Sequence, residues 1–308
     1  MSSRRAAQVL VDQLKIHGVD MAFGVPGESY LALLDALHDA NSIRMIVCRQ
    51  EGGASMMADA YGKLTGRPGL CLVTRGPGTA NAISGIHVAM QDSTPMVVLI
   101  GQVARNARGR EALQEVDYKQ FLGGMVKYVE EIIDPRRIPE YVSRAFYAAA
   151  GGRPGPVALA LPEDMLEEST DTLDTEPYTR IEPHPSNEQL NALVEILSQA
   201  EQPIMLLGGS QWDVDTIKQI ERFATAFVLP VCTAFRRQDR FDNRHPCYAG
   251  DLGIAANPKL AARVRAADVL IAVGGRLGEA TTAGYRLVTV PHPQQKLVHI
   301  HPDPNELG

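Results

Sequence analysis

Short apolar runs and longer segments of helical period alternate along the first half of the chain. Apolar residues that recur every three to four positions predict helices with one buried face at residues 4–17, 30–40, 51–64 and 79–91. Short apolar runs, several of them ended by glycine or proline, predict strands at residues 19–25, 43–48, 69–74 and 95–100. Strands that alternate with helices pair in parallel through right-handed crossovers, so we expect an open, doubly wound sheet.

Residues 167–187 interrupt this alternation. They are rich in acidic residues, threonine and proline and have no apolar period, which predicts a surface linker. The alternation then restarts, with predicted helices at residues 189–198, 217–227 and 258–267 and predicted strands at residues 203–207, 229–233, 269–273 and 296–300. The pattern therefore predicts an α/β protein with two doubly wound parallel-sheet domains, residues 1–166 and 188–308, on either side of the linker.

The composition of the 308 residues excludes several functional classes. The apolar runs are far shorter than the ~18 residues of a membrane helix, and the N-terminus has no apolar signal core. A net charge of −6 with interspersed signs offers no basic surface for nucleic acid. We expect a soluble, cytoplasmic protein without nucleic-acid or membrane partners. The cysteines form no CxxC pair and are too sparse for a disulfide framework: Cys48, Cys71, Cys232 and Cys247.

Glu51 is the side chain whose position in the pattern most suggests chemistry. It follows a predicted strand, opens a predicted helix and precedes Gly52 and Gly53. Ligands bind outside the carboxyl ends of the strands in open parallel sheets, which is where Glu51 is predicted to lie. One interpretation is that its charge offsets the helix dipole, a contribution of about 0.3–1 kcal/mol. The functional interpretation requires a carboxyl group shielded from water, and an apolar strand leading into a helix start would provide that shielding.

Residues 76–81, with the sequence GPGTAN, contain half of a dinucleotide-binding fingerprint. The string reads GxGxxN instead of GxGxxG, and no acidic residue ends the following predicted strand at the usual distance. The structural interpretation is a tight strand-to-helix turn in which Gly76 and Gly78 adopt unusual backbone angles. The missing third glycine and the missing acid argue against a nicotinamide-dependent dehydrogenase.

The histidines give little evidence for a metal site. His299 and His301 fall on one face of a predicted strand, but the sequence places no third ligand nearby. His17, His38 and His87 are expected to pack or to face solvent. We therefore assign no metal ligands in this chain.

Four longer strings occur in order along the first half: FGVPGES from Phe23, RQEGGASMMADAYGKLTGRPG from Arg49, TRGPGTANAISGIHVAMQDSTPMVVLIGQV from Thr74, and GGRPGPVALALPEDM from Gly151. Taken together, they resemble the N-terminal domain of thiamine diphosphate-dependent enzymes, and within these the acetolactate synthase group. The later strings VLIAVGGRLGE and LVHIHPDPNELG resemble the central domain of the same enzymes. The resemblance covers essentially the whole chain.

The resemblance implies that the first domain binds the aminopyrimidine half of thiamine diphosphate. Glu51 would share a proton with the pyrimidine ring nitrogen, which favours the imino form that deprotonates the thiazolium carbon. Gln114 matches a glutamine that faces the reacting centre in acetolactate synthases, and Arg153 matches a position that contacts FAD. The other cofactor-binding residues that the resemblance implies are Pro26, Gly27, Thr74, Gly76, Pro77, Gly78 and Asn81.

The sequence departs from the acetolactate synthase pattern at several positions. Arg75 stands where these enzymes usually carry serine, which adds a charge beside the cofactor, and Leu113 replaces a usual aromatic residue. The GGRLGEATT segment differs from the RFDDR-type segment of the flavin-containing members, and His301 replaces a common aspartate. These departures weaken the expectation of FAD and of pyruvate as substrate, whereas Arg153 keeps FAD among the expected cofactors.

The Gly-Asp-Gly segment and the later asparagine that hold the divalent metal and the diphosphate in these enzymes are absent from this sequence. Residues 250–253, Gly-Asp-Leu-Gly, have the wrong glycine spacing. We therefore expect an incomplete, inactive portion of an enzyme or one subunit of a two-chain enzyme, with Mg²⁺ held by the absent domain or by a separate diphosphate-binding chain. The family's active site lies between subunits, which implies a homodimer or homotetramer.

The implied activity is decarboxylation of a 2-oxo acid followed by carboligation, with acetolactate formation from two pyruvates as the leading case. An alternative within the family is another 2-oxo-acid decarboxylase or lyase, for example a benzoylformate decarboxylase-like, glyoxylate carboligase-like or sulfoacetaldehyde-processing enzyme. A further alternative is a non-catalytic, dimerising fragment without affinity for the cofactor.

Overall fold

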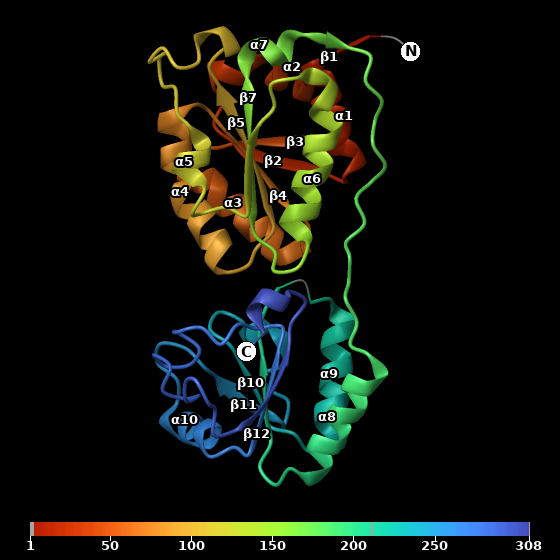
Figure 1. Cartoon of the computed structure of the whole chain (residues 1–308), viewed down its shortest axis with the longest axis vertical. Coiled ribbons are helices and arrows are strands. Elements are labelled where there is room, and N and C mark those ends of the chain that lie inside the picture. Colours follow the sequence, from red (N-terminus) through yellow and green to blue (C-terminus); the bar gives the residue numbers. More distant parts are fainter. Residues whose placement is uncertain (1–2, 211, 308) are drawn as a thin grey trace. The chain divides into compact units, whose positions relative to one another are not determined.

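A computed structural model describes residues 3–210 and 212–307, and the chain divides into unit 1, Met1–Ile181, and unit 2, Glu182–Gly308 (Figure 1). The division falls inside the predicted linker. Each unit has its own parallel sheet with helices on both faces, so the predicted fold class is confirmed.

Unit 1 is built on a six-stranded sheet whose strands all run parallel, in the order β3-β2-β4-β5-β7-β6. The central strands β4, β5 and β7 are buried along their whole length, as expected for a sheet covered on both faces. The strands are β2 (Met21–Gly24), β3 (Arg44–Val47), β4 (Gly69–Val73), β5 (Met96–Gln102), β6 (Tyr128–Glu131) and β7 (Pro156–Pro162). The hydrophobic pattern predicts the first four of these, and β6 and β7 complete the sheet.

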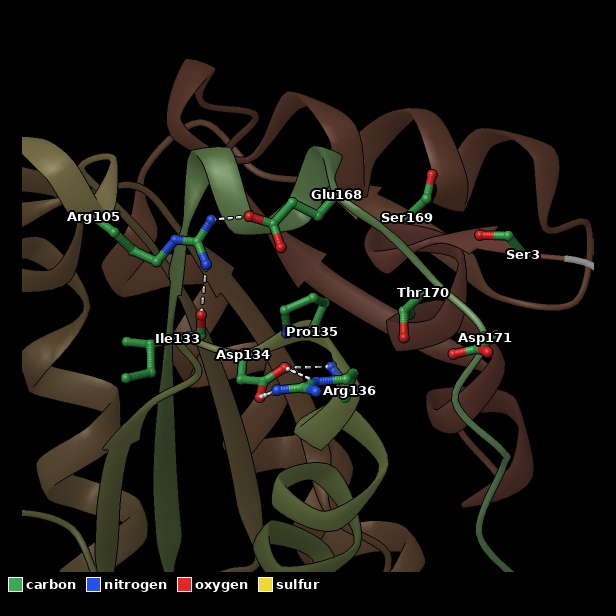
Figure 2. Close-up of a pocket in the computed structure, with 10 residues that line it drawn as sticks. All are labelled: Ser3, Arg105, Ile133, Asp134, Pro135, Arg136, Glu168, Ser169, Thr170 and Asp171. Atoms are coloured by element: carbon green, nitrogen blue, oxygen red, sulfur yellow. Dashed lines mark hydrogen bonds and ion pairs between the residues drawn. The ribbon is translucent and has the colours of Figure 1, made fainter.

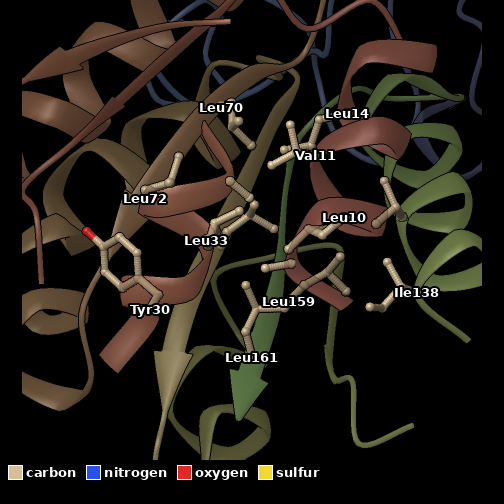
Figure 3. Packing of buried hydrophobic residues seen from close by; sticks show 14 of the residues in the cluster. Leu10, Val11, Leu14, Tyr30, Leu33, Leu70, Leu72, Ile138, Leu159 and Leu161 are labelled. Atoms are coloured by element: carbon tan, nitrogen blue, oxygen red, sulfur yellow. The ribbon is translucent and has the colours of Figure 1, made fainter. Parts of the chain in front are cut away.

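Two helical layers cover this sheet (Figure 1). Figure 3 shows one layer, in which leucines of α1 and α2 pack against leucines of β4 and β7. Each leucine side chain buried in this way contributes about 1.5–3 kcal/mol. This layer contains α1 (Ala6–Ile16), α2 (Leu31–Asp39), α6 (Ile138–Ala150) and α7 (Glu163–Glu167), and the opposite layer contains α3 (Glu51–Thr65), α4 (Gly76–Gln91) and α5 (Tyr118–Leu122).

The first half of the predicted linker lies on the surface of unit 1 and is bound to it. β8 (Ser169–Thr170) pairs antiparallel with β1 (Arg4–Arg5). Arg4 forms an ion pair with Asp174 at 2.8 Å, and the Gln13 side chain donates to the same carboxylate at 2.7 Å. The polar residues that indicated a solvated segment are therefore partners for polar groups of α1.

Tyr178 extends this contact onto a buried histidine at the end of α1. The backbone N–H of Tyr178 donates to Nδ1 of His17 at 3.1 Å, and the His17 ring stacks on Phe146 with the ring centroids 4.9 Å apart. His17 is 6% exposed, and its Nε2 has no hydrogen-bond partner among the described residues. Burial lowers the pKa of His17 to about 4, so the ring is neutral at pH 7 and its Nδ1 can accept the bond from Tyr178.

Unit 2 has a five-stranded parallel sheet in the order β11-β10-β9-β12-β13. α8 (Asn187–Gln199) and α9 (Val214–Phe227) cover one face, and α10 (Pro258–Arg265) covers the other. The hydrophobic pattern predicts these helices and every strand except β11. The strands are β9 (Ile204–Leu207), β10 (Val231–Thr233), β11 (Tyr248–Asp251), β12 (Val269–Val273) and β13 (Lys296–Ile300).

The remaining helical elements are short. In the part of the chain that the structure describes, no helix combines the length and the apolar character needed to cross a bilayer. The four cysteines are all free. Single turns of 3₁₀ helix lie at Glu28–Tyr30, Arg105–Ala107, Pro135–Arg137, Gln238–Arg240 and Pro304–Glu306.

Candidate active site

The carboxyl ends of the parallel strands of unit 1 meet at one edge of the sheet. Three predicted site segments begin there: Pro26 and Gly27 follow β2, Glu51 follows β3, and Thr74 follows β4. Because the strand order is β3-β2-β4, these segments are neighbours although they are far apart in the sequence. This is the edge at which open parallel sheets bind ligands.

Glu51 is the first residue of α3 and is 8% exposed. Its Oε2 atom accepts a hydrogen bond from Nδ2 of Asn81 on α4, at 3.0 Å. Within the described part of the chain, Oε1 accepts none. The helix is capped by Gln50, whose side chain accepts from the N–H of Gly53 at 3.1 Å. The carboxyl group of Glu51 therefore takes no part in capping and is turned toward α4, although its place in the first turn also suits the helix dipole.

The sequence suggested that the strand before Glu51 shields its carboxyl group from water. In the structure the shielding comes from α4. β3 is the edge strand of the sheet, and Val47 at its end is 64% exposed. α3 and α4 are packed so closely that a Cβ on Gly85 would lie 2.2 Å from Oγ of Ser55. This close packing brings Asn81 within hydrogen-bonding distance of Glu51.

Thr74 lies between two glycines that approach its side chain closely. A Cβ on Gly27 would lie 2.7 Å from Cβ of Thr74. A Cβ on Gly78 would lie 2.6 Å from Cγ2 of Thr74 and 3.3 Å from Oε1 of Glu51. A side chain at either position would press against Thr74, and at Gly78 it would also reach Oε1 of Glu51.

The loop after β2 is fixed by two buried residues that sequence reasoning missed. The Ser29 hydroxyl lies 2.8 Å from Oγ1 of Thr74, and the Tyr30 hydroxyl donates to the carbonyl of Val25. Burial raises the pKa of Tyr30, so its hydroxyl stays protonated and remains a donor. Ser29 is the last residue of the FGVPGES string, so the string itself contained the signal.

Residues 76–81 form the start of α4 and not the strand-to-helix turn that the sequence predicts. The helix begins at Gly76, and neither Gly76 nor Gly78 has a positive φ. Pro77 occupies the first turn, where its missing N–H is not required. Gly76 is needed for close approach, because a Cβ there would lie 2.9 Å from Cγ2 of Val116.

Arg153 lies at the edge of the sheet opposite Glu51, and the predicted role of Gln114 at the reacting centre stays a prediction. Gln114 is exposed, has a φ of 64°, and accepts a bond from the N–H of Gly76 through its backbone carbonyl at 3.2 Å. Arg153 precedes β7 and therefore lies at the amino edge of the sheet. Its guanidinium donates to Oγ of Ser93 at 3.1 Å and to the carbonyl of Met90 at 2.8 Å. The predicted contact of Arg153 with FAD stays a prediction.

The sequence suggested that Arg75 adds a charge beside the cofactor. In the structure this charge is paired and not free. Arg75 is 7% exposed, and its guanidinium pairs with the carboxylate of Glu163, the first residue of α7. Sequence reasoning missed Glu163, because the contact spans 88 positions and no local pattern reports it.

A hollow of about 790 Å³ elsewhere in unit 1 is the competing candidate (Figure 2). Its arginines are paired with acids of the same hollow, Arg105 with Glu168 and Arg136 with Asp134 at 2.7 Å. No buried donor or acceptor of this hollow lacks a partner among the described residues. The Glu51 cluster is favoured because it lies at the carboxyl edge of the sheet, and because its largely buried carboxyl group has an oxygen that accepts no hydrogen bond from the described residues.

The structure gives no metal site in the part of the chain that it describes. No group of three or more His, Cys, Asp or Glu side chains there could hold an ion. The two histidines at β13 contact backbone groups: Nε2 of His299 lies 2.8 Å from the carbonyl of Gly275, and Nδ1 of His301 accepts from the N–H of Asp303 at 3.0 Å.

Two family models match the chain in the order that its two units suggest. The thiamine pyrophosphate enzyme N-terminal TPP binding domain matches residues 4–121, and the thiamine pyrophosphate enzyme central domain matches residues 190–308. The chain belongs to the thiamine pyrophosphate enzyme family. The N-terminal match includes Glu51, Thr74 and Asn81, so the residues gathered at the edge of the first sheet lie within the family's TPP-binding domain.

Relatives with acetolactate synthase names match both units. The acetolactate synthase large subunit of Parasynechococcus marenigrum is 36% identical over 311 residues, which are 98% of this chain and 50% of the relative. The acetolactate synthase isozyme 2 large subunit of Escherichia coli is 32% identical over 308 residues, 98% of this chain and 54% of the relative. The probable acetolactate synthase large subunit of Methanocaldococcus jannaschii is 32% identical over 313 residues. The chain spans about half the length of these curated relatives.

Proposed function

We propose that the carboxyl edge of the unit 1 sheet holds the aminopyrimidine half of thiamine diphosphate and that Glu51 exchanges a proton with it. The observation that carries this proposal is the shielded Glu51 carboxyl, which is bound by Asn81 at one oxygen and has no partner at the other within the described residues. An acceptor left without a partner in a shielded place suits a ligand that brings a donor. The group therefore fits the residues present.

The residues around Glu51 have separable tasks in this proposal. Asn81 holds Oε2 and so orients Oε1, the atom that exchanges the proton. Thr74 and Gly78 form the adjoining wall, and Pro26 with Gly27 forms the wall after β2. When bound, thiamine diphosphate supplies a thiazolium carbon that loses a proton and adds to the carbonyl of a 2-oxo acid. Shielding of Glu51 keeps the shared proton from exchanging with bulk water.

The proposed activity is acetolactate synthase-like: decarboxylation of a 2-oxo acid with carboligation. The names of the matching relatives support this class. Another thiamine diphosphate-dependent 2-oxo-acid decarboxylase or lyase is the second candidate, because a buried Arg75, paired with the partly exposed Glu163, stands at the site edge where the resembled synthases usually carry serine. No group of three or more His, Cys, Asp or Glu side chains that could hold Mg²⁺ lies among the described residues, and we propose that a further domain or chain supplies the ligands of Mg²⁺ and of the diphosphate.

We propose that the working assembly is a homodimer or homotetramer with the site between subunits. α3 presents exposed apolar side chains close in sequence to Glu51: Met56 is 40% and Met57 is 45% exposed. Exposed methionines beside a candidate site suit a surface that a second copy covers.

The glycines at the carboxyl edge of the unit 2 sheet pack against each other, and FAD as a cofactor stays a prediction. Gly208 and Gly209 after β9, and Gly274 and Gly275 after β12, follow adjacent strands, where a dinucleotide's phosphates would approach glycine backbone. These glycines contact each other instead, since a Cβ on Gly209 would lie 2.0 Å from the carbonyl oxygen of Gly274. No step is therefore assigned to a flavin.

The test uses the chain with Mg²⁺ and thiamine diphosphate, alone and together with a diphosphate-binding domain. Calorimetry measures binding, and NMR in D₂O measures exchange of the thiazolium proton. We expect Glu51→Gln to slow this exchange by about 100-fold or more, the usual range for removal of a general acid or base. Glu140→Gln, which changes an exposed carboxylate paired with Arg137, is the matched control and should leave both measurements unchanged.

Equal exchange rates in Glu51→Gln and the unsubstituted protein would refute the role of Glu51. Absence of any affinity for the cofactor, in both preparations, would favour the non-catalytic, dimerising fragment. Release of CO₂ from a panel of 2-oxo acids then separates the acetolactate synthase-like activity from the other decarboxylases.

A further inference from the structure

Arg75 is a buried arginine at the junction between β4 and α4. Its side chain is 9% exposed, its guanidinium pairs with Glu163, and its Nε is buried without a hydrogen-bond partner among the described residues. A guanidinium that is withdrawn from water and only partly satisfied is costly to keep. The burial of Arg75 therefore lowers the stability of the fold, which indicates that this side chain has another role.

The ion pair joins two strands that are not neighbours. Glu163 directly follows β7, and β5 lies between β4 and β7 in the sheet. The Arg75 side chain thus crosses the carboxyl end of β5, on the same edge that carries Glu51. A contact of this span fixes the β4–α4 junction relative to the far half of the sheet.

The start of α4 is also held by the Thr79 hydroxyl, which donates to the carbonyl of Thr74 at 3.1 Å, and by one backbone bond. Arg75 is the N-cap residue, and no side chain caps this helix. The N–H of Gly76 donates to the carbonyl of Gln114, which belongs to an exposed segment with a positive φ. Helix starts without a capping side chain are frayed more easily.

The first turns of α4 carry the residues that contact Glu51. Asn81 donates to Oε2 at 3.0 Å, and the Gly78 backbone passes close to Oε1. A shift of the junction by a few tenths of an ångström changes both contacts, because the helix moves as a rigid element.

We propose that Arg75 is a positioning residue, whose ion pair with Glu163 ties the start of α4 to the far half of the sheet and holds Asn81 and Gly78 against Glu51. The consequence for cofactor binding rests on the proposed function, whereas the effect on α4 does not.

The first experiment measures hydrogen–deuterium exchange of peptides from residues 74–84 in the chain without ligand. We expect Arg75→Ser to speed exchange there by about tenfold, the effect of losing one part-buried, charge-assisted hydrogen bond. The matched control is Arg137→Ser. Arg137 is also an N-cap arginine without a cap bond, and it pairs with Glu140, but its side chain is 47% exposed. Exposed pairs contribute little, so we expect a change below about twofold in the first turn of α6.

The second experiment separates positioning from simple loss of packing. The exchanged pair Arg75→Glu/Glu163→Arg should restore exchange to within about threefold of the unsubstituted chain, and Arg75→Lys should lie between the two. Asparagine-selective ¹⁵N labelling gives the side-chain amide resonances of Asn81. They should shift in Arg75→Ser and return in the exchanged pair.

Unchanged exchange in Arg75→Ser, equal changes in Arg75→Ser and Arg137→Ser, or no recovery in the exchanged pair would each overturn the proposal. If Arg75→Ser does not fold, Arg75→Lys and the exchanged pair still decide. If Glu51→Gln leaves cofactor binding and exchange of the thiazolium proton unchanged, the proposed function fails. The role of Arg75 in holding α4 is then tested by the hydrogen–deuterium exchange measurements alone.

Discussion

The two units use glycine at the carboxyl edges of their sheets for different purposes. In unit 1, Gly27 and Gly78 bring backbone close to the side chains of Thr74 and Glu51. In unit 2, glycines after β9 and β12 bring two loops into contact, and a Cβ on Gly209 would lie 2.0 Å from the carbonyl oxygen of Gly274. A glycine-rich segment after a strand thus does not identify a site by itself. The groups that the glycines approach decide whether the edge carries chemistry or only closes the fold.

Gly209→Ala is expected to have the largest effect on this comparison. Gly209 has a φ of 76°, and its Cβ would meet a backbone atom that cannot rotate away. Both the strained backbone and the clash oppose a side chain, so we expect the free energy of unfolding of unit 2 to fall by about 3–5 kcal/mol. The only tryptophan of the chain, Trp212, lies in unit 2 and reports its unfolding by fluorescence.

The matched control is Gly278→Ala in the same unit. A Cβ on Gly278 meets nothing within 4 Å, and its φ is not positive. We expect a change within about 0.5 kcal/mol. Equal midpoints for the two variants would show that the contact between the glycine pairs is not needed for the fold.

The hydrophobic pattern predicts most of the fold because it reports burial in each segment. The prediction leaves out β7, although its sequence PVALALP is apolar and fully buried. It also leaves out β6, whose sequence YVEE ends in two acids, and β11, whose sequence YAGD is short and only partly buried. β6 and β11 are at the edges of their sheets, where one side needs no apolar partner. Their positions follow from pairing with β7 and β10, which is a property of the whole sheet and not of the segment.

The candidate site was predictable in part for the same reason. Glu51, Thr74 and Gly27 each follow a strand, so a sequence pattern and a parallel sheet suffice to gather them at one edge. The Arg75–Glu163 pair depends on the order β4-β5-β7, which local patterns do not fix. The linker shows the same limit. Its sequence places Tyr178 in a polar segment, and only the fold shows that the Tyr178 N–H donates to His17.

Lowering the pH should destabilise unit 1 more than unit 2, and this is the second-largest of the expected effects. His17 in unit 1 has a pKa of about 4 when folded and about 6.5 when unfolded, so the unfolded chain binds the extra proton between these values. Stability is therefore full above about pH 6.5 and falls as the pH falls toward 4, by up to about 3 kcal/mol. Protonation also removes the acceptor for the Tyr178 N–H. Hydrogen–deuterium exchange of peptides from α1 and α6 measures the loss.

His17→Gln should remove most of this pH dependence. His38→Gln is the matched control, because the His38 side chain is 88% exposed. Burial also lowers the pKa of His301 in unit 2, but that ring is only half-buried, so the acid-induced loss followed by Trp212 fluorescence should be smaller. A larger loss in unit 2 than in unit 1 would contradict this assignment.

Gly78→Ala is the smallest of the three effects and the most specific to the site. Alanine in a helix gains up to about 1 kcal/mol over glycine, which offsets much of the cost of a contact of 2.6 Å with Thr74. Unit 1 should therefore change in stability by less than about 1 kcal/mol, in contrast to unit 2 with Gly209→Ala. Rotation of the Thr74 side chain away from the new methyl group would break its 2.8 Å contact with Ser29. We therefore expect Thr74 and residue 78 to shift together beside Glu51. We expect affinity for thiamine diphosphate, measured by calorimetry, to fall by about tenfold.

Gly53→Ala on α3, where a Cβ meets nothing within 4 Å, should leave that affinity unchanged. Equal affinities for the two variants would place the pyrimidine away from Gly78 and make the unit 1 glycines structural, like those of unit 2.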